Sequence, residues 1–219
     1  MSKHIAAQRL ASGASERPRV PQAFFDALYA NDEDPWGFAT RDYEREKYAH
    51  TLSCLGDARF GRGLEIGCSI GVLSERLAEI CDELVGIDVS ERALDLARSR
   101  LRDRANVTFV SSTFPEQMPN GPWDLVVCSE VLYYLDAPAF ALALTRLTEA
   151  IDRGAAILVV HWRPPTETYP MRGDDVHDKL VKELRDWHLI DDRRECYRLD
   201  LFGPTSTGQA TGPRRDIAC

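Results

Sequence analysis

The sequence lacks the features that mark several common classes of protein. No apolar run approaches the roughly 20 residues that a helix needs to cross a bilayer. The N-terminal stretch contains charged residues but no apolar core, so no secretory signal is predicted. Basic residues are not in excess, because the 219 residues carry a net charge of −8, which argues against a general nucleic-acid binder. We therefore expect a cytoplasmic protein that binds neither membrane nor nucleic acid.

Cysteine is present, but not at the spacing of a metal site. The six cysteines include no Cys-x-x-Cys pair and no neighbouring histidine cluster, so no metal is predicted. Four of them lie in apolar segments, where a thiol packs as a small hydrophobic group, and a reduced compartment is expected. Cys219 lies in a polar tail and is expected to be exposed and unreactive.

The length and a hydrophobic fraction of 44% fit one domain with a full core. We expect residues 1–20 to be disordered and residues 21–60 to form an N-terminal helical cap, since PQAFFDALYA and TRDYEREKYAHTLSCL both have helical patterns. Residues 61–202 would form the ligand-binding domain. Residues 203–219, rich in Gly, Thr and Pro, would form a second disordered tail. The protein is expected to be a monomer or a homodimer.

From residue 63 onward, apolar runs alternate with amphipathic stretches. This pattern is typical of a Rossmann-like α/β fold, in which helices cover both faces of a mostly parallel sheet. Ser90 is placed as a helix N-cap. The predicted strands are 63–67, 83–90, 106–112, one within 123–135, 155–162 and, at an edge, 196–202; the predicted helices are 72–81, 91–101, 138–151 and 174–187. Ligands of such sheets bind beyond the carboxyl ends of the strands.

The first strand ends in the glycine-rich stretch GLEIGCSIG. A dinucleotide fingerprint needs Gly-x-Gly-x-x-Gly, but counting from Gly67 the third position is Ser69 and the sixth is Val72. Two residues before Gly67 stands Glu65. A carboxylate there would repel a pyrophosphate and tolerate an ammonium or sulfonium group, while Gly67 and Gly71 let the backbone approach a ligand closely.

The second strand ends at Asp88, 21 residues after Gly67. An acid at this point can accept hydrogen bonds from both hydroxyls of a ribose, and it disfavours a 2′-phosphate. The alternative for Asp88 alone is a carboxylate that caps the following helix. The combination with Glu65 and the two glycines favours the ribose interpretation.

This combination resembles the class I S-adenosylmethionine (SAM)-dependent methyltransferases over about residues 60–202, which implies a seven-stranded sheet, SAM as cofactor and S-adenosylhomocysteine as product. In that family the glycine-rich loop holds the methionine and ribose of SAM, and the residues after the third strand lie by the adenine. Ser69 replaces the family's middle glycine, and Ser and Thr stand where many members have an adenine-binding acid. The cofactor residues implied are Glu65, Gly67, Cys68, Gly71, Asp88, Val89, Ser112, Thr113, Phe114 and Ser129.

A narrower resemblance extends outside that core. DEDPWGFATRDYEREKY, LEIGCSIGVLSERLA and HWRPPTETYPMRGDDVH look like the nodulation protein S (NodS) group of small methyltransferases. The namesake of that group methylates the free amine of a deacetylated chitooligosaccharide. The resemblance implies a small-molecule acceptor, with an amine as its reacting group.

Catalytic candidates follow the fourth and fifth strands. Glu130 is the leading residue for orienting or deprotonating the amine, with a solvated carboxylate as the alternative. Tyr134 would shape the pocket or bind the acceptor, and His161 would face the ligand; core packing is the alternative for both. His177 is a weaker candidate, because a histidine in a polar helix is usually just solvated.

Residues of the cap add three candidates. Lys47 would meet the methionine carboxylate of SAM, and Trp36 or Tyr43 its cationic centre. Aromatic packing of the cap against the sheet is the alternative.

The function predicted is methyl transfer from SAM to the amine of an amino sugar or a related specialised metabolite. Two alternatives stay open: a methyltransferase acting on oxygen or carbon with the same fold, and a non-catalytic SAM-binding module. A nicotinamide-dependent reductase is disfavoured by Ser69 and Val72 in the fingerprint.

Overall fold

Apolar runs rich in Val, Ile and Leu form the central strands of one sheet. The structure is a computed structural model that describes residues 17–204. Its strand order is β3-β2-β1-β4-β5-β7-β6; β1 to β5 run parallel to one another, and β7 is antiparallel to both β5 and β6. The strands are β1 (Phe60–Ile66), β2 (Cys81–Asp88), β3 (Val107–Ser111), β4 (Leu125–Ser129), β5 (Ala156–Trp162), β6 (His188–Arg193) and β7 (Tyr197–Phe202).

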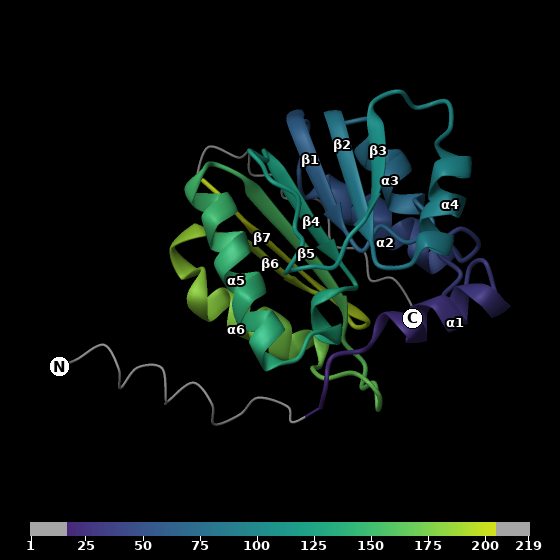
Figure 1. Cartoon of the computed structure of the whole chain (residues 1–219). Coiled ribbons are helices and arrows are strands. Elements are labelled where there is room, and N and C mark those ends of the chain that lie inside the picture. The colour runs from purple at the N-terminus through teal and green to yellow at the C-terminus, as the bar shows by residue number, and fades with distance from the viewer. Residues whose placement is uncertain (1–16, 205–219) are drawn as a thin grey trace.

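Helices cover both faces of this sheet. Figure 1 shows α5 and α6 on one face and α2, α3 and α4 on the other. The helices are α1 (Gln22–Asn31), α2 (Asp42–Ser53), α3 (Val72–Leu77), α4 (Glu91–Arg100), α5 (Ala137–Asp152) and α6 (Gly173–Glu183), with 3₁₀ turns η1 (Leu132–Tyr134) and η2 (Arg185–Trp187). The predicted Rossmann-like fold with a mostly parallel seven-stranded sheet is confirmed. That α1 and α2 form a cap distinct from a domain at 61–202 stays a prediction.

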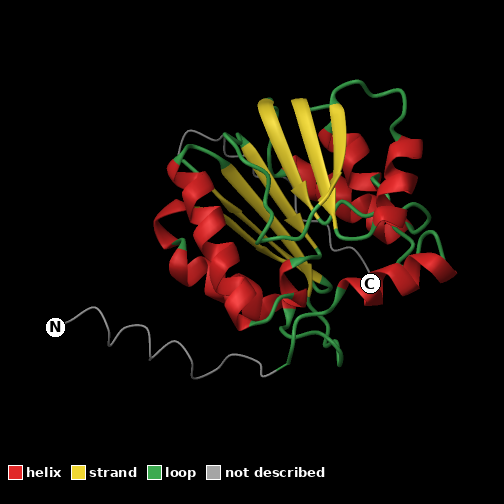
Figure 2. Cartoon of the chain, in the orientation of Figure 1, coloured by secondary structure: helices red, strands yellow, loops and turns green. Residues whose placement is uncertain are grey.

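The strand order reverses between β1 and β4. Both strands end at the same edge of the sheet, and the chain leaves them in opposite directions, which opens a crevice there. Figure 2 shows the strand arrowheads at this edge, with α1 running along it. A ligand site is therefore expected beneath α1.

The strand predicted over 196–202 is present as β7, but its predicted place at the edge is wrong, and one further strand was not predicted. Residues 196–202 alternate in polarity, yet β7 lies between β5 and β6 and every residue of it is buried. The alternation comes from Arg198 and Asp200, which pair with each other inside the protein. The outermost strand on this side is β6, which sequence analysis missed because His188–Arg193 is mostly polar.

Two local predictions also differ. The helix predicted over 72–81 ends at Leu77, because Cys81 pairs with Phe60 as the first residue of β2. Ser90 stands at the N-cap of α4, but its side chain accepts no hydrogen bond from the helix; its own backbone N–H donates to Asp88 instead.

Four cysteines, at 54, 68, 81 and 128, are free and buried. Cys196 is disulfide-bonded, which departs from the reduced setting that sequence analysis favoured. None of the helices in residues 17–204 has the length and apolar character to cross a bilayer. Predictions for residues 1–16 and 205–219, Cys219 included, lie outside the described residues.

Candidate active site

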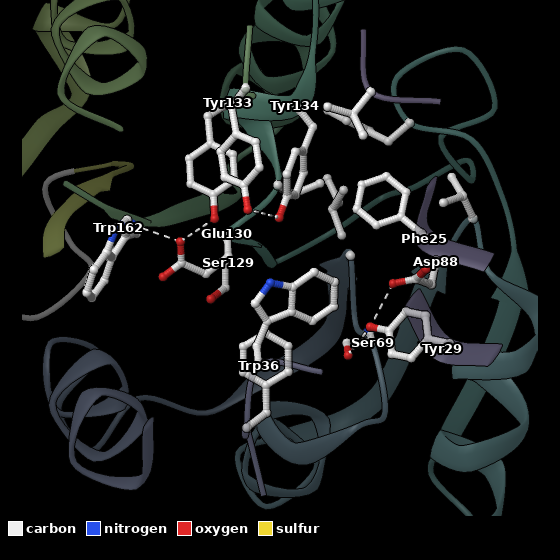
Figure 3. Close-up of a pocket in the computed structure, with 18 of the residues that line it drawn as sticks. Phe25, Tyr29, Trp36, Ser69, Asp88, Ser129, Glu130, Tyr133, Tyr134 and Trp162 are labelled. Carbon is white, nitrogen blue, oxygen red and sulfur yellow. Dashed lines mark hydrogen bonds between the residues drawn. The ribbon is translucent and has the colours of Figure 1, made fainter. Parts of the chain in front are cut away.

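A cavity of about 1180 Å³ opens at the carboxyl ends of β1, β2 and β4. Its walls come from α1, α2 and the segments that follow β1 to β5. Figure 3 shows Tyr29, Ser69 and Asp88 on one side of it, and Glu130, Tyr133 and Trp162 on the other. Of the predicted site residues, the lining includes Gly67, Asp88, Val89, Ser112, Thr113, Phe114, Ser129, Glu130, Tyr134, Trp36, Tyr43 and Lys47.

The turn after β1 is tied to the end of β2. Gly67 and Ser69 both have positive φ angles, +74° and +51°. The Ser69 N–H donates to Asp88 Oδ2 at 2.9 Å, and the Ser90 N–H donates to Asp88 Oδ1 at 2.9 Å. Each carboxylate oxygen keeps a free lone pair, so Asp88 can still accept from ligand hydroxyls. Burial raises the pKa of Asp88, and backbone hydrogen bonds oppose that rise.

The turn is also held from α1, by a residue that sequence analysis missed. The hydroxyl of Tyr29 is hydrogen-bonded to Ser69 Oγ, and Tyr29 is almost fully buried. Its ring meets Trp36 edge to face at 5.7 Å. In the sequence Tyr29 belongs only to the helical pattern of PQAFFDALYA, and no local pattern links it to a loop 40 residues away.

The segment after β3 forms the end of the cavity beyond Asp88. The Ser112 hydroxyl donates to the Gln117 carbonyl at 2.7 Å, and the Thr113 N–H donates to Gln117 Oε1 at 3.1 Å. Phe114 supplies an apolar wall, and its carbonyl accepts from Arg19. This end of the cavity therefore offers apolar surface and the lone pairs of the Ser112 hydroxyl, whose proton is already donated.

On the opposite wall, Glu130 is held by three donors. Lys47 Nζ lies 2.8 Å from its Oε1, while the Tyr133 hydroxyl and the Trp162 N–H each donate to Oε2 at 2.8 Å. Glu130 has a φ of +57°, which a non-glycine residue adopts at a cost. These contacts fix the carboxylate at the cavity wall and leave Oε1 a lone pair for a further donor.

Lys47 joins two carboxylates in a buried triad. Its Nζ also lies 2.8 Å from Glu44 Oε2, and Lys47 is 1% exposed. Burial alone would lower the pKa of Lys47, but Glu130 and Glu44 raise it overall, so the amine stays charged. In this structure the partners of Lys47 are Glu44 and Glu130, and the triad has one negative charge in excess when both carboxylates are ionised. The ammonium group has three donors, so the contact of Lys47 with a methionine carboxylate stays a prediction.

Aromatic rings enclose the cavity between these two walls. Trp36 stacks on Phe38 at 5.5 Å, and Tyr134 meets Phe25 and Tyr169 edge to face. Tyr43 packs against Trp162 at 5.9 Å, and its hydroxyl is buried without a hydrogen-bond partner. Ring faces of this kind attract cations such as sulfonium and ammonium groups. The rings that sequence analysis did not assign to the site are Phe25, Tyr29, Phe38, Tyr133, Trp162 and Tyr169.

His161 does not line the cavity, which corrects its prediction as a catalytic residue. It is fully buried behind the wall, and its Nε2 accepts the Leu132 N–H at 3.0 Å. Its Nδ1 lies 3.1 Å from His177 Nε2. With both ring nitrogens engaged inside the protein, His161 is not available to take a proton from an acceptor.

A model of the nodulation protein S (NodS) family matches residues 26–155, more than half of the chain. The chain belongs to the NodS family. Nodulation protein S of Rhizobium tropici is 32% identical over 58% of this chain and 54% of its own length, and that of Bradyrhizobium diazoefficiens 34% over 47% and 50%. The chain thus spans about half the length of the curated NodS relatives it matches.

This chain is also similar to solved structures and to a further group of enzymes. A chain from Pseudomonas syringae, described as a methyltransferase, is 36% identical with a TM-score of 0.66, over 75% of this chain and 100% of that one. The N-methyltransferase NodS of Bradyrhizobium japonicum WM9, in complex with S-adenosylhomocysteine, has a TM-score of 0.69 at 23% identity, over 83% and 96%. A ubiquinone biosynthesis O-methyltransferase from Alkalilimnicola ehrlichii is 32% identical over 58% of this chain and 54% of its own length.

Three predicted cofactor residues of this NodS-family chain lie outside the main cavity. Gly71, at a φ of +79°, is the N-cap residue before α3 and packs against Ala97 and Leu101. Glu65 and Cys68 face a separate cavity of about 20 Å³. Glu65 accepts a hydrogen bond from Ser74, and burial raises its pKa from 4.5 to about 8. Its carboxyl group is thus mostly protonated at neutral pH. The prediction that a negative charge on Glu65 repels a pyrophosphate and tolerates a sulfonium group is therefore not supported by this structure.

The raised pKa of Glu65 makes stability depend on pH in a defined direction. Between pH 4.5 and 8 the folded protein keeps a proton that the unfolded chain releases, so stability falls as the pH rises. Relative to Glu65→Gln, the unliganded wild type should lose on the order of 2–3 kcal/mol between about pH 5 and pH 7, at about 1.4 kcal/mol per pH unit. Urea unfolding of both proteins at the two pH values measures this difference.

Glu79→Gln is the matched control, because Glu79 follows α3 and is exposed. The free energy of unfolding of Glu79→Gln should change with pH by the same amount as that of the wild type. Parallel curves for Glu65→Gln as well would mean that Glu65 is ionised in the folded protein.

Proposed function

We propose that this protein transfers a methyl group from SAM to the amine nitrogen of a small molecule, with an amino sugar or a related specialised metabolite as acceptor. The observation that carries the proposal is a single cavity with two chemically different walls, Asp88 with the Gly67–Ser69 turn on one side and Glu130 on the other. Its volume of about 1180 Å³ is above the roughly 300–1,000 Å³ of an ordinary ligand pocket, so two reactants have room to meet.

The first wall fits a nucleoside joined to a cationic group. Asp88 has lone pairs for two ribose hydroxyls, and Gly67 allows the positive φ of the turn and has no Cβ, which would crowd Val131. Ser112, Thr113 and Phe114 would flank the base, and Trp36 and the Tyr29 ring would face the cation. SAM, when bound, supplies a methyl group on a positively charged sulfur.

The second wall fits an amine. The triad of Glu44, Lys47 and Glu130 contains two carboxylates and one ammonium group, so its net charge is −1 when both carboxylates are ionised. The ammonium group of an acceptor would neutralise that charge. An alkyl amine with a pKa near that of lysine, about 10.4, is almost wholly protonated at pH 7, and only its neutral form attacks. Glu130 would hold the nitrogen in line and accept its proton, and the aromatic wall would exclude water.

A hydroxyl acceptor is the second candidate, favoured by the similarity to an O-methyltransferase. A hydroxyl is a weak nucleophile until a base removes its proton. His161 cannot serve as that base, because its nitrogens are bonded to Leu132 and His177. Glu130 would then have to serve as that base, and the excess negative charge of its triad favours an ammonium group over a neutral hydroxyl, which supports the amine.

The cofactor half of the proposal is tested by thermal unfolding with S-adenosylhomocysteine or NAD. A ligand at a thousand times its dissociation constant stabilises by about 4 kcal/mol, which corresponds to roughly 8–16 °C for a chain of this size. We expect a rise of this order with S-adenosylhomocysteine and none with NAD. A rise with NAD alone would overturn the proposal.

The acceptor half is tested by incubating the protein with SAM and a fully deacetylated chitin tetramer. Mass spectrometry should detect methylation of the tetramer, and the N-acetylated tetramer, which has no free amine, is the matched control. Equal methylation of both sugars would indicate a hydroxyl acceptor. Stabilisation by S-adenosylhomocysteine without methylation across a panel of amines and alcohols would indicate a binding module.

A further inference from the structure

Behind the Glu130 wall lies a buried line of polar groups that the proposed reaction does not use. The Leu132 N–H donates to His161 Nε2 at 3.0 Å, His161 Nδ1 lies 3.1 Å from His177 Nε2, and His177 Nδ1 is hydrogen-bonded to Asp200 Oδ2. The side chains come from β5, α6 and β7, and all three are fully buried. We call His161, His177 and Asp200 the histidine chain.

The hydrogen bonds of the histidine chain can run in only one direction. A backbone N–H only donates, so His161 Nε2 must be the unprotonated nitrogen, and the proton of the neutral ring lies on Nδ1. That proton is donated to His177 Nε2, so the proton of His177 lies on its own Nδ1 and is donated to Asp200. Asp200 requires the same directions from the other end, because an ionised carboxylate only accepts: His177 must donate from Nδ1 and accept at Nε2, which places the His161 proton on Nδ1.

The surrounding charges keep both histidines neutral. Burial lowers the pKa of His161, and His177 and Lys47 lower it further. Burial also lowers the pKa of His177, against the opposite pull of Asp200 and Asp174 and with Arg198 adding to the decrease. Asp200 stays ionised: burial would raise its pKa, but hydrogen bonds from His177 and His188 and the charge of Arg198 bring it to about 2.

The far end of the histidine chain reaches the candidate catalytic segment. Leu132 opens η1, two residues after Glu130 and directly before Tyr133 and Tyr134. The Tyr133 ring lies 5.0 Å from the His161 ring, and its hydroxyl donates to Glu130. Glu130 has a positive φ, so this segment needs tethers to hold its shape. With the other tautomer, a protonated Nε2 would face the Leu132 N–H and the tether would be lost.

We propose that the histidine chain is a positioning device: Asp200, through His177, sets the tautomer of His161, and His161 holds the Glu130–Tyr134 segment at the cavity by the Leu132 N–H. The tautomer and the tether stand on their own, whereas the consequence for turnover rests on the proposed methyl transfer. His161 and His177 act through the backbone and do not touch the reactants.

Nitrogen NMR of the full chain labelled with ¹⁵N-histidine tests the tautomer without any acceptor. The shift of each ring nitrogen distinguishes a protonated from an unprotonated atom, and His161→Gln identifies the His161 signals. The wild type at pH 7 should show His161 protonated at Nδ1 only. Protonation of His161 at Nε2, or at both nitrogens, would overturn the proposal.

Two substitutions at His177 then test the connection. Gln has an acceptor and a donor, so His177→Gln can keep both contacts of the histidine chain, whereas His177→Leu keeps neither. The Gln variant should retain the Nδ1–H tautomer of His161 and the Leu variant should lose it. An unchanged tautomer in a folded Leu variant, or its loss in a folded Gln variant, would refute the role of His177.

Turnover of the deacetylated chitin tetramer, or of whichever acceptor is methylated above, supplies the functional readout. His177→Leu should lower kcat by about tenfold, the size of one lost hydrogen bond in the catalytic arrangement, and His177→Gln should restore most of it. The dissociation constant for S-adenosylhomocysteine should stay the same in both variants. A Leu variant that loses thermal stability but keeps its kcat would show that the histidine chain only packs.

Discussion

Replacement of Asp88 by alanine is expected to raise the dissociation constant for S-adenosylhomocysteine by at least about a hundredfold. Two ribose hydrogen bonds account for roughly 1–3 kcal/mol of this loss. The structure adds a second cost, because Asp88 also accepts the Ser69 and Ser90 N–H groups. Without the carboxylate these two donors lose their partner, and the turn at Ser69 loses the bond that supports its positive φ. Calorimetric titration of both proteins measures the change.

Asp82→Ala is the matched control for this measurement. Asp82 lies on the same strand, β2, near its opposite end, and its side chain is 74% exposed. Its loss should leave the dissociation constant unchanged to within about twofold, as for most surface substitutions. If Asp88→Ala bound S-adenosylhomocysteine as the control does, Asp88 would be only a structural support of the turn.

Much of the fold could be predicted because its central strands are continuous apolar runs. Strands β4 and β5 are buried on both faces, and their sequences contain almost no polar residue. The last two strands, β6 and β7, are not continuous apolar runs. The inner strand β7 contains Arg198 and Asp200, which neutralise each other in the interior, while the polar β6 forms the edge. A polar alternation of this kind is typical of an exposed strand face, and it does not reveal that two opposite charges on that face will be buried together.

For the candidate site, too, local sequence predicts some features and not others. Gly67, Ser112 and Glu130 each follow a strand and Asp88 ends one, so their place at one edge of a parallel sheet could be predicted from local sequence. What local sequence could not give is which side chains meet. Lys47 and Glu130 are 83 residues apart, and their contact depends on how α2 docks under the sheet edge.

His161 shows why position alone is a weak guide to role. It lies near the end of β5, as a ligand-facing residue would, yet its side chain points into the protein. Successive side chains of a strand alternate between the two faces. His161 meets His177 of α6 on one face, whereas Trp162, the next residue, lines the cavity.

Glu130→Gln is expected to lower kcat by about 10²–10⁴-fold, the range for loss of a positioned acid–base group, while S-adenosylhomocysteine binds nearly as before. Gln keeps the size of the side chain but removes the negative charge that would hold an ammonium and take its proton. The NH₂ group of Gln also replaces one of the two carboxylate oxygens, both of which now accept hydrogen bonds. It would therefore face either Lys47, or the Tyr133 hydroxyl and the Trp162 N–H. Initial rates with the methylated acceptor, at saturating SAM, measure kcat and KM separately.

Glu44→Gln separates this chemical role from the electrostatics of the triad. Glu44 is the other partner of Lys47, also at 2.8 Å, and it belongs to α2 and not to the segment after β4. Removing either carboxylate leaves the buried Lys47 with one partner, so both variants should lose stability by a similar amount, below the roughly 3–5 kcal/mol of a fully broken buried pair. Both should raise KM, because the cavity loses its excess negative charge. Only Glu130→Gln should lower kcat, since an interaction made in the transition state is lost only there; equal kcat values in the two variants would remove Glu130 from the chemical step and leave it as part of a cation-binding wall.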